Sequence, residues 1–483
     1  MRLPAWLVAA LLAPLLAFMP RASGQVLPDL GSAADAPISV QMERRIGESV
    51  VRDIRARDPS YLDDPEIEDY LGALGAKLAQ ANPGTRLEFE FFVIRDSTVN
   101  AFALPGGFVG VHTGLITIAE TESELASVLG HEIAHVTERH MARMLGRQQQ
   151  MQAPVLAAMA AAILLGRSRP DLAAAGLLGA QGAAIQTSLA YTRDFEREAD
   201  RVGLQSLQAA GFDARAMAVF FERLQRSTRL ADDGSVPGYL RTHPLTTERI
   251  ADAQARAAEL PYRQRLDSPE FQLVRAKLRA ESGEPRDAVS HFEASVREKR
   301  YASEAAARYG LAAALLRAKR PKDADTELTR LRATGSVAMV ETLAARIRQA
   351  LGDKAGAIAL LSTARVKFPY SRPLLYAQVD ALEQAGRTQE ALAAASDAQR
   401  LYPRDARLYG LQSKAYAALG KRFLQHQAQA EVYALQGSLP AAIEQLQLAR
   451  AANDGDFYQQ SVVDVRLKEL RAAYAQETKD MKR

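Results

Sequence analysis

The sequence predicts an α+β fold in its first half and an all-α solenoid in its second half. Apolar residues recur at helical spacing through most of the 483 residues, whereas a clear strand pattern is confined to a stretch near residue 90. From about residue 266 the chain is rich in Ala, Leu, Arg and Gln, gives no strand signal and carries a repeat. Because the chain is too long for one ordinary core, we expect two or three domains.

The composition is that of a folded protein without a nucleic-acid-binding arm. Hydrophobic residues make up 48% of the chain and charged residues 24%. The net charge of +4 is small for this length and no segment is strongly basic, so no nucleic-acid partner is expected. The absence of cysteine excludes disulfides, thiolate metal ligands and a lipid attached to an N-terminal cysteine.

Residues 1–24 have the pattern of a signal peptide. Arg2 gives a positive start, Leu3 to Met19 is almost wholly apolar, and Ala22 to Gly24 supplies the small residues that a signal peptidase reads. A retained membrane anchor is the alternative, because the apolar run approaches spanning length. Three prolines and the small-residue site favour cleavage near Gly24. We therefore expect an exported protein, and a bacterial periplasm is the expected compartment.

The first domain, expected over residues 25–265, begins with two helices and a small sheet. Val40 to Arg57 has apolar residues at helical spacing, and Pro65 opens a second helix to about Ala81. Leu87 to Ile94 begins with alternating apolar and charged residues and predicts a half-buried strand. Phe102 to Val111 is rich in Gly and β-forming residues and predicts a turn that leads into an edge strand.

A long helix follows, and an unusual apolar segment comes after it. The helix is predicted from Thr121 to Leu145, with a capping-box pattern at its start. Residues 153–186 form two apolar arms around a charged interruption, each too short to span a bilayer. A buried helical hairpin is one interpretation; a flap or a segment in peripheral contact with a membrane is the other. No transmembrane helix is predicted after residue 24.

The second domain, expected over residues 266–483, contains a repeat of 34 residues. Gly352, Gly386 and Gly420 stand at equal steps, with small residues and prolines at similar offsets around the first two. This period is the signature of tetratricopeptide-like helical hairpins, with an ordinary helical bundle as the alternative. Gly437 starts another turn about half a repeat early, so the last repeats depart from this phase. Such solenoids have concave surfaces that bind protein segments, so we expect a protein partner.

The motif His131-Glu132-Ile133-Ala134-His135 indicates a zinc site. On a helix, residues four apart share a face, so the imidazoles of His131 and His135 point into one site. Neutral imidazole is a favoured zinc ligand, and Glu132 is placed to take a proton from a zinc-bound water. His140, five residues after His135, is rotated off the shared face, and we interpret it as a surface residue.

A catalytic zinc site needs a third protein ligand and an open position. On the helix predicted around residues 194–201, Glu196 and Asp200 share a face while Glu198 points nearly opposite. Glu196 can therefore bind the metal while Asp200 accepts the outer N–H of a ligating histidine. A solvated charged face is the alternative, but apolar residues at 199–204 bury part of this helix.

These motifs, together with Asn100 to Gly107, resemble those of the HtpX-like metalloendopeptidases. The similarity to exported members with C-terminal repeats extends over essentially the whole mature chain. The resemblance implies a mainly helical, zincin-type metalloprotease domain with a small β-sheet, followed by the tetratricopeptide-like solenoid. It also implies one zinc ion per chain held by His131, His135 and Glu196, with Glu132 as the general base.

The resemblance implies further roles for three segments. Asp200 would support a ligating histidine, and the strand Gly107–Val111 would bind substrate in extended form at a sheet edge. His243, in Thr242-His243-Pro244, would occupy the fourth zinc position and hold the enzyme latent. Arg249 would contact the oxyanion or the substrate carbonyl.

The resemblance also implies a function and a partner. The protein would be a periplasmic endopeptidase in the quality control and assembly of outer-membrane proteins, acting on unfolded or misassembled substrates. Its repeats would bind the outer-membrane β-barrel assembly machinery. The alternative is a chaperone-like scaffold with a latent or structural zinc site, which His243 would close as a permanent ligand. Glu132 beside the metal argues against that alternative, and the split apolar stretches disfavour a membrane-embedded protease.

Overall fold

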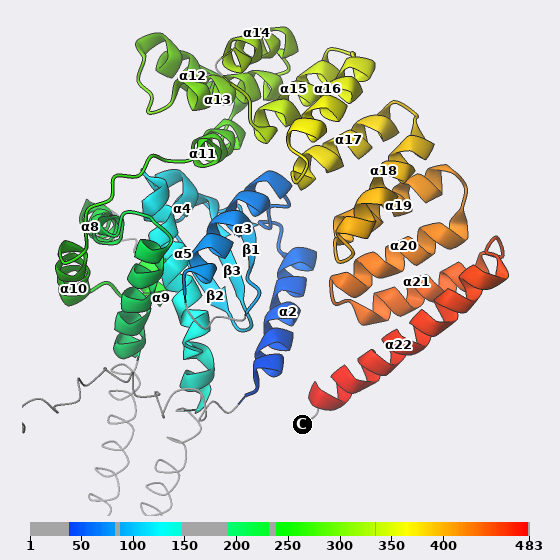
Figure 1. Ribbon diagram of the computed structural model, residues 1–483, viewed down its shortest axis with the longest axis horizontal. Helices are drawn as coiled ribbons and strands as arrows, with labels where there is room; N and C mark the ends of the chain where they lie inside the picture. Colours follow the sequence, from blue (N-terminus) through cyan, green and yellow to red (C-terminus); the bar gives the residue numbers. More distant parts are fainter. Residues whose placement is uncertain (1–37, 83–86, 147–191, 231–237, 334, 482–483) are drawn as a thin grey trace, which may run out of the picture.

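The computed structural model describes residues 38–82, 87–146, 192–230, 238–333 and 335–481. The predicted signal peptide and the apolar segment 153–186 lie outside the described residues. Within the described part of the chain, no helix combines the length and apolarity needed to cross a membrane. The fold is mainly helical with one small sheet, and a long series of repeat helices arches over the first domain (Figure 1).

The first domain packs helices around a three-stranded sheet. Local capping starts its helices: Ser39 and Asp64 accept backbone N–H groups at the starts of α2 and α3, and Thr121 does so at α5. Further helical segments cover residues 140–146 and 192–209. The named elements are α2 (Val40–Arg57), α3 (Pro65–Gln80), β1 (Glu90–Ile94), β2 (Ala101–Leu104), β3 (Phe108–His112), α4 (Thr113–Ile118), α5 (Glu122–Thr137), α8 (Arg215–Leu230), α9 (Gly238–Thr242) and α10 (Thr247–Ala258).

The sheet has the order β1-β3-β2, which corrects one expectation. β3 pairs with β1 in parallel and with β2 antiparallel, so Gly107–Val111 leads into the central strand and is not an edge. A turn at Pro105–Gly107 folds β3 back along β2, and β1 occupies its other side. Among the described strands, β2 therefore forms the sheet edge next to α5.

The predicted helix Thr121–Leu145 is two helices. α5 ends at Thr137, and Arg139 then takes a left-handed conformation with φ of 55° before the chain resumes a helix at His140. Such a conformation costs roughly 1–2 kcal/mol for a residue with a side chain. Tertiary contacts oppose this cost, because the Arg139 guanidinium donates to Glu43 at 2.9 Å and to the carbonyl of Ile38 at 2.7 Å. His140 consequently leaves the line of α5.

After residue 268 the described chain is helical throughout, as the sequence predicts. The turns at Gly352, Gly386 and Gly420 have φ of 86°, 76° and 72°, which glycine adopts without a Cβ penalty. Lys319, with φ of 59°, forms the corresponding turn in an earlier hairpin. The helices are α11 (Pro269–Glu281), α12 (Pro285–Glu298), α13 (Glu304–Arg317), α14 (Pro321–Arg332), α15 (Ala338–Ala350), α16 (Lys354–Lys367), α17 (Arg372–Gln384), α18 (Thr388–Leu401), α19 (Ala406–Ala418), α20 (Arg422–Leu435), α21 (Leu439–Ala451) and α22 (Phe457–Met481).

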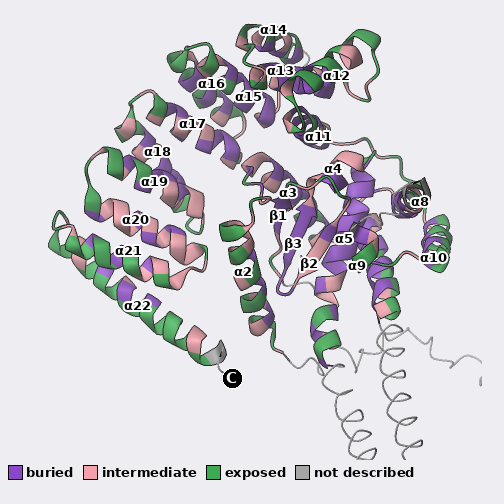
Figure 2. Ribbon diagram, turned by 180° about the vertical axis from the view of Figure 1, so that it is seen from behind, coloured by how far each residue is buried: buried purple, intermediate pink, exposed green. Residues whose placement is uncertain are grey.

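The hydrophobic cores divide the solenoid unequally. One continuous cluster joins the first domain to the helices α11–α15, and α11 packs against α3 and α4. Two smaller clusters hold α15–α19 and α20–α22. Figure 2 shows α5 and β3 largely buried, whereas much of α22 is exposed.

Candidate metal centre

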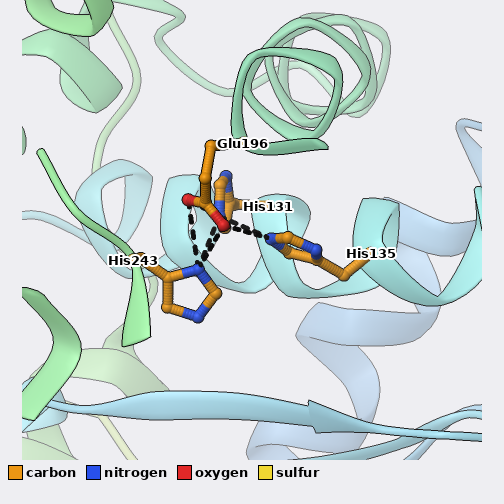
Figure 3. A group of neighbouring side chains, drawn as sticks. All are labelled: His131, His135, Glu196 and His243. Carbon is orange, nitrogen blue, oxygen red and sulfur yellow. Dashed lines mark hydrogen bonds and ion pairs between the residues drawn. The ribbon is translucent and has the colours of Figure 1, made fainter. Parts of the chain in front are cut away.

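α5 places the two motif histidines on one buried face. Leu125, Leu129 and Ile133 seat this helix in the hydrophobic core. His131 is 0% exposed, and its Nε2 lies 3.0 Å from Nε2 of His135 (Figure 3). The two rings therefore direct one nitrogen each toward a common point, as the i, i+4 spacing predicts.

Glu196 reaches this point from the helix at residues 192–209. That helix crosses α5 where two glycines meet, and a Cβ on Gly203 would lie 2.9 Å from the backbone nitrogen of His131. The close crossing brings Glu196 to the histidines: its Oε2 lies 3.4 Å from His131 Nε2, and its Oε1 lies 3.4 Å from His135 Nε2. A bulkier residue at position 203 would force the helices apart.

His243 completes the cluster from the end of α9. Its Nδ1 lies 3.0 Å from Glu196 Oε1 and 3.3 Å from His131 Nε2. Two backbone bonds fix this segment: Tyr239 N–H donates to the Val99 carbonyl, and His243 N–H donates to the Tyr239 carbonyl. The ligand atoms of His131, His135, Glu196 and His243 all lie within 4.8 Å of one another.

The donor set suits zinc. Three imidazole nitrogens and one carboxylate oxygen are ligands that Zn²⁺ prefers in four-coordinate sites. The outer nitrogen of His131 lies 2.9 Å from Asp200 Oδ1, which leaves its Nε2 lone pair for a metal. With His131, His135 and Glu196 as ligands, the fourth position is the one that His243 faces.

Glu132 is a buried carboxylate beside these ligands. It is 0% exposed, and neither carboxylate oxygen has a hydrogen-bond partner among the described residues. Nε2 of His243 lies 3.5 Å from Glu132 Oε1. Burying a carboxylate without donors is costly, so this position indicates a chemical role rather than a structural one.

Glu132 lines a cleft of about 350 Å³ next to the cluster. The edge strand β2 contributes Phe102 to Leu104 to one wall, and the start of the helix at residues 140–146 contributes Met141 and Met144. The cleft is therefore bordered by a sheet edge, apolar side chains and the candidate metal ligands.

Asp200 and Arg249 support the cluster from behind. Arg249 donates to both oxygens of Asp200, at 2.7 and 2.8 Å, and its Nη1 lies 2.8 Å from Glu196 Oε2. It is 4% exposed and is not among the residues that line the cleft. In this structure the guanidinium of Arg249 contacts the two carboxylates, and its expected contact with an oxyanion or substrate carbonyl stays a prediction.

The electrostatics keep both carboxylates charged. Burial would raise the pKa of Glu196, but hydrogen bonds with His131, His135 and His243 outweigh burial and lower it. Burial would likewise raise the pKa of Asp200, and the bonds with His131 and Arg249 lower it. Burial lowers the pKa of His131, yet Asp200 and Glu196 raise it to about 9. The cluster thus holds the anionic charge that a divalent cation needs.

The sequence did not predict that His140 and Tyr239 belong to this site. His140 is not a surface residue: it is 3% exposed, and its Nδ1 lies 2.9 Å from Nδ1 of His135. Burial, with His135 and Arg143 nearby, lowers the pKa of His140 to about 2, so the ring is neutral. Tyr239 stacks on His243 at a ring distance of 4.8 Å, and its buried hydroxyl has no hydrogen-bond partner within the described ranges. Tyr239 lies four residues before His243, a helical spacing that could have predicted their contact.

Comparison with known proteins assigns this site to a family. Residues 64–257, from the start of α3 to the end of α10, match the sequence model of Peptidase family M48. The beta-barrel assembly-enhancing protease of Yersinia pestis is 32% identical over 483 residues, covering 96% of this chain and 98% of that protein. The chain belongs to peptidase family M48. The M48 assignment makes it a metallopeptidase by family, with the four converging residues as candidate ligands.

Other M48 relatives show similar agreement. The Escherichia coli K12 protein, also named beta-barrel assembly-enhancing protease, is 32% identical over 458 residues, which cover 93% of this chain and 92% of that protein. A Vibrio cholerae relative is 38% identical over 307 residues, 63% of each chain. The alignments with the Yersinia pestis and Escherichia coli relatives therefore extend beyond the M48 segment into the repeats.

Proposed function

We propose that the protein is a zinc-dependent endopeptidase of the periplasm that acts in the quality control and assembly of outer-membrane proteins. The observation that carries the proposal is the convergence of four ligand side chains within 4.8 Å beside the buried carboxylate of Glu132, which has no hydrogen-bond partner among the described residues. The four are His131, His135, Glu196 and His243. A structural zinc site has no use for a buried base at that position. A hydrolytic site requires one.

The chain's own residues supply the proton transfers. Zinc held by His131, His135 and Glu196 would polarise the scissile carbonyl and acidify a water molecule. Glu132 accepts a proton from the attacking water on a carboxylate oxygen and later delivers it to the leaving amine. Asp200 holds the tautomer of His131 through the contact at Nδ1, and Arg249 holds Asp200.

The substrate is an extended polypeptide. The edge of β2 offers backbone donors and acceptors to any sequence, and it borders the cleft that contains Glu132. An unfolded or misassembled chain presents extended segments that can pair with such an edge. The apolar side chains of Met141 and Met144 in the cleft favour the apolar residues that unfolded proteins expose.

The repeat domain would recruit the partner. Its helical hairpins form an arch, the architecture that binds protein segments (Figure 1). The name of the two full-length relatives, beta-barrel assembly-enhancing protease, supports the outer-membrane β-barrel assembly machinery as that partner and the periplasm as the compartment. The signal-peptide pattern of residues 1–24 agrees with export.

The first test compares the parent chain with Glu132→Gln on an unfolded protein substrate. We expect zinc to bind both, and cleavage by the variant to fall about 10²–10⁴-fold because the base is lost. Glu341→Gln is the matched control: it neutralises another buried carboxylate, on α15, and should leave cleavage unchanged. Parent-level cleavage by Glu132→Gln, or cleavage that survives complete zinc removal, would refute the proposal.

A chaperone-like scaffold is the second candidate, because His243 faces the fourth ligand position. In the endopeptidase, His243 is a latch whose displacement opens that position. His243→Ala should then cleave faster than the parent. If the parent and His243→Ala both bind zinc but cleave no unfolded substrate, the protein is a scaffold and not an endopeptidase.

A further inference from the structure

His140 joins the candidate ligand His135 to a second carboxylate. Its Nδ1 lies 2.9 Å from Nδ1 of His135, and its Nε2 lies 3.1 Å from Glu198 Oε2. The ring also stacks on Phe195, with centroids 4.3 Å apart and planes at 22°. Arg143 holds the far carboxylate, since its Nη1 lies 2.8 Å from Glu198 Oε2.

Only one set of proton positions satisfies all three side chains when a metal is bound. His135 directs Nε2 toward His131 and Glu196, so a metal takes that lone pair and the proton of His135 sits on Nδ1. The Nδ1 of His140 must then accept this proton's hydrogen bond. The proton of His140 therefore sits on Nε2 and is donated to the carboxylate of Glu198.

We propose that His140 and Glu198 are positioning residues that fix the tautomer and ring orientation of His135 for metal binding. The inference rests on the proposed zinc site and adds the residues that hold one of its ligands. A metal-bound histidine ordinarily donates its outer N–H to a carboxylate or a backbone carbonyl. The outer nitrogen of His131 lies 2.9 Å from a carboxylate oxygen of Asp200, whereas His135 reaches its carboxylate through an interposed imidazole.

A packing role predicts a different response to substitution. If His140 only filled space against Phe195, a phenyl ring would replace it without loss. If His140 positions His135, zinc affinity depends on a hydrogen-bond acceptor at the place of His140 Nδ1. A different side chain with an acceptor there should then restore much of the affinity. Substitutions of similar size that differ in hydrogen-bonding atoms therefore distinguish the packing role from the positioning role.

The experiment measures zinc affinity of the full chain by competition with a chromophoric chelator. His140→Phe keeps a stacked ring but removes both nitrogens, and we expect the affinity to fall about 10–100-fold. His140→Asn keeps an acceptor near Nδ1 and should recover most of that loss. Glu198→Gln keeps an acceptor without the charge, so its decrease should be smaller than that of His140→Phe. The matched control is His426→Phe in the repeats, where Nδ1 lies 2.9 Å from Gln445 Oε1; it should bind zinc like the parent.

The absorption spectrum of the Co²⁺-substituted chain gives a second readout that general destabilisation does not move. We expect altered d–d bands in His140→Phe and parent-like bands in His140→Asn. Equal zinc affinity and equal spectra in His140→Phe and the parent would overturn the inference and leave the endopeptidase standing. A parent chain that binds no zinc would overturn both. If His140→Phe does not fold, Glu198→Ala, which removes the acceptor, decides, and parent-like affinity in that variant overturns the inference.

Discussion

The two ends of the repeat arch are attached to the first domain in different ways. Helices α11–α15 share one continuous hydrophobic core with the first domain. Farther along, the arch meets the same domain through charged side chains: Arg372 pairs with Asp69, and Arg407 pairs with Asp63. The first attachment is made by buried apolar side chains, and the second is made by part-exposed charged side chains.

The region between the distant repeats and the first domain is a polar cavity of about 940 Å³. Arg55 and Glu68 line it from the first domain, and Tyr376 and Lys414 line it from the arch. At the tip, Arg52 of α2 donates to the carbonyl of Gly437. Buried apolar area gives a stability that salt does not screen, whereas exposed ion pairs contribute little and are screened. The near attachment should therefore be rigid and the far attachment adjustable.

The near attachment gives the largest expected effect. Phe271 of α11 is 0% exposed and packs with Tyr70 of α3 at a ring distance of 6.5 Å. Phe271→Ala should lower the free energy of unfolding by about 3–5 kcal/mol, because it opens a cavity in the shared core. Urea unfolding measures the loss. Phe457→Ala is the control, since Phe457 on α22 is 89% exposed and should cost almost nothing; equal losses would break the comparison.

A buried ion pair strengthens the near attachment. Lys277 of α11 lies 2.5 Å from Asp64 and 2.6 Å from Glu66 at the start of α3. Lys277→Met leaves these carboxylates without their cation and should cost about 3 kcal/mol at neutral pH. Lys414→Met, which removes an exposed lysine paired with Glu383 at 3.7 Å, is the matched control.

The pH dependence of Lys277 has a definite sign. Burial lowers the pKa of Lys277, but Glu66 and Asp64 outweigh it and raise the pKa above its ordinary value. The folded form therefore binds the proton more tightly than the unfolded form, and this stability is fully present below the unfolded pKa of about 10.4. It is lost as the pH rises through the folded pKa. The stability difference between the parent and Lys277→Met should thus shrink in alkaline titration; a constant difference would contradict the assigned shift.

Local sequence patterns predicted the elements well where local forces decide them. The helix Val40–Arg57 has the expected bounds, because Ser39 caps it and its apolar spacing is regular. The repeat glycines Gly352, Gly386 and Gly420 occupy the left-handed turns that their spacing implies. For the site, the helical spacing alone placed His131 and His135 on one face.

The errors arose where distant contacts decide the structure. Neither glycine nor proline marks the end of α5; Arg139 turns the chain there because Glu43, 96 positions away, holds its side chain. An extrapolated straight helix therefore misplaced His140. The central position of β3 depends on β1 joining its far side, which no alternation pattern encodes. The two carboxylate partners of Arg249 likewise come from another helix, so the sequence pattern did not predict them.

The far attachment gives the smallest expected effect and the sharpest test of the comparison. Replacing Arg372 and Arg407 by Ala together removes the part-exposed ion pairs with Asp69 and Asp63, and also the 3.7 Å pair of Arg372 with Asp405 within the arch. The free energy of unfolding should change by less than about 2 kcal/mol. Hydrogen exchange should nevertheless rise in α17 and α19 and stay unchanged in α11. About 1 M salt should reproduce this pattern in the parent, because screening then acts within about 3 Å. A stability loss matching that of Phe271→Ala would mean that both ends are held by cores, and the arch would then be one rigid body.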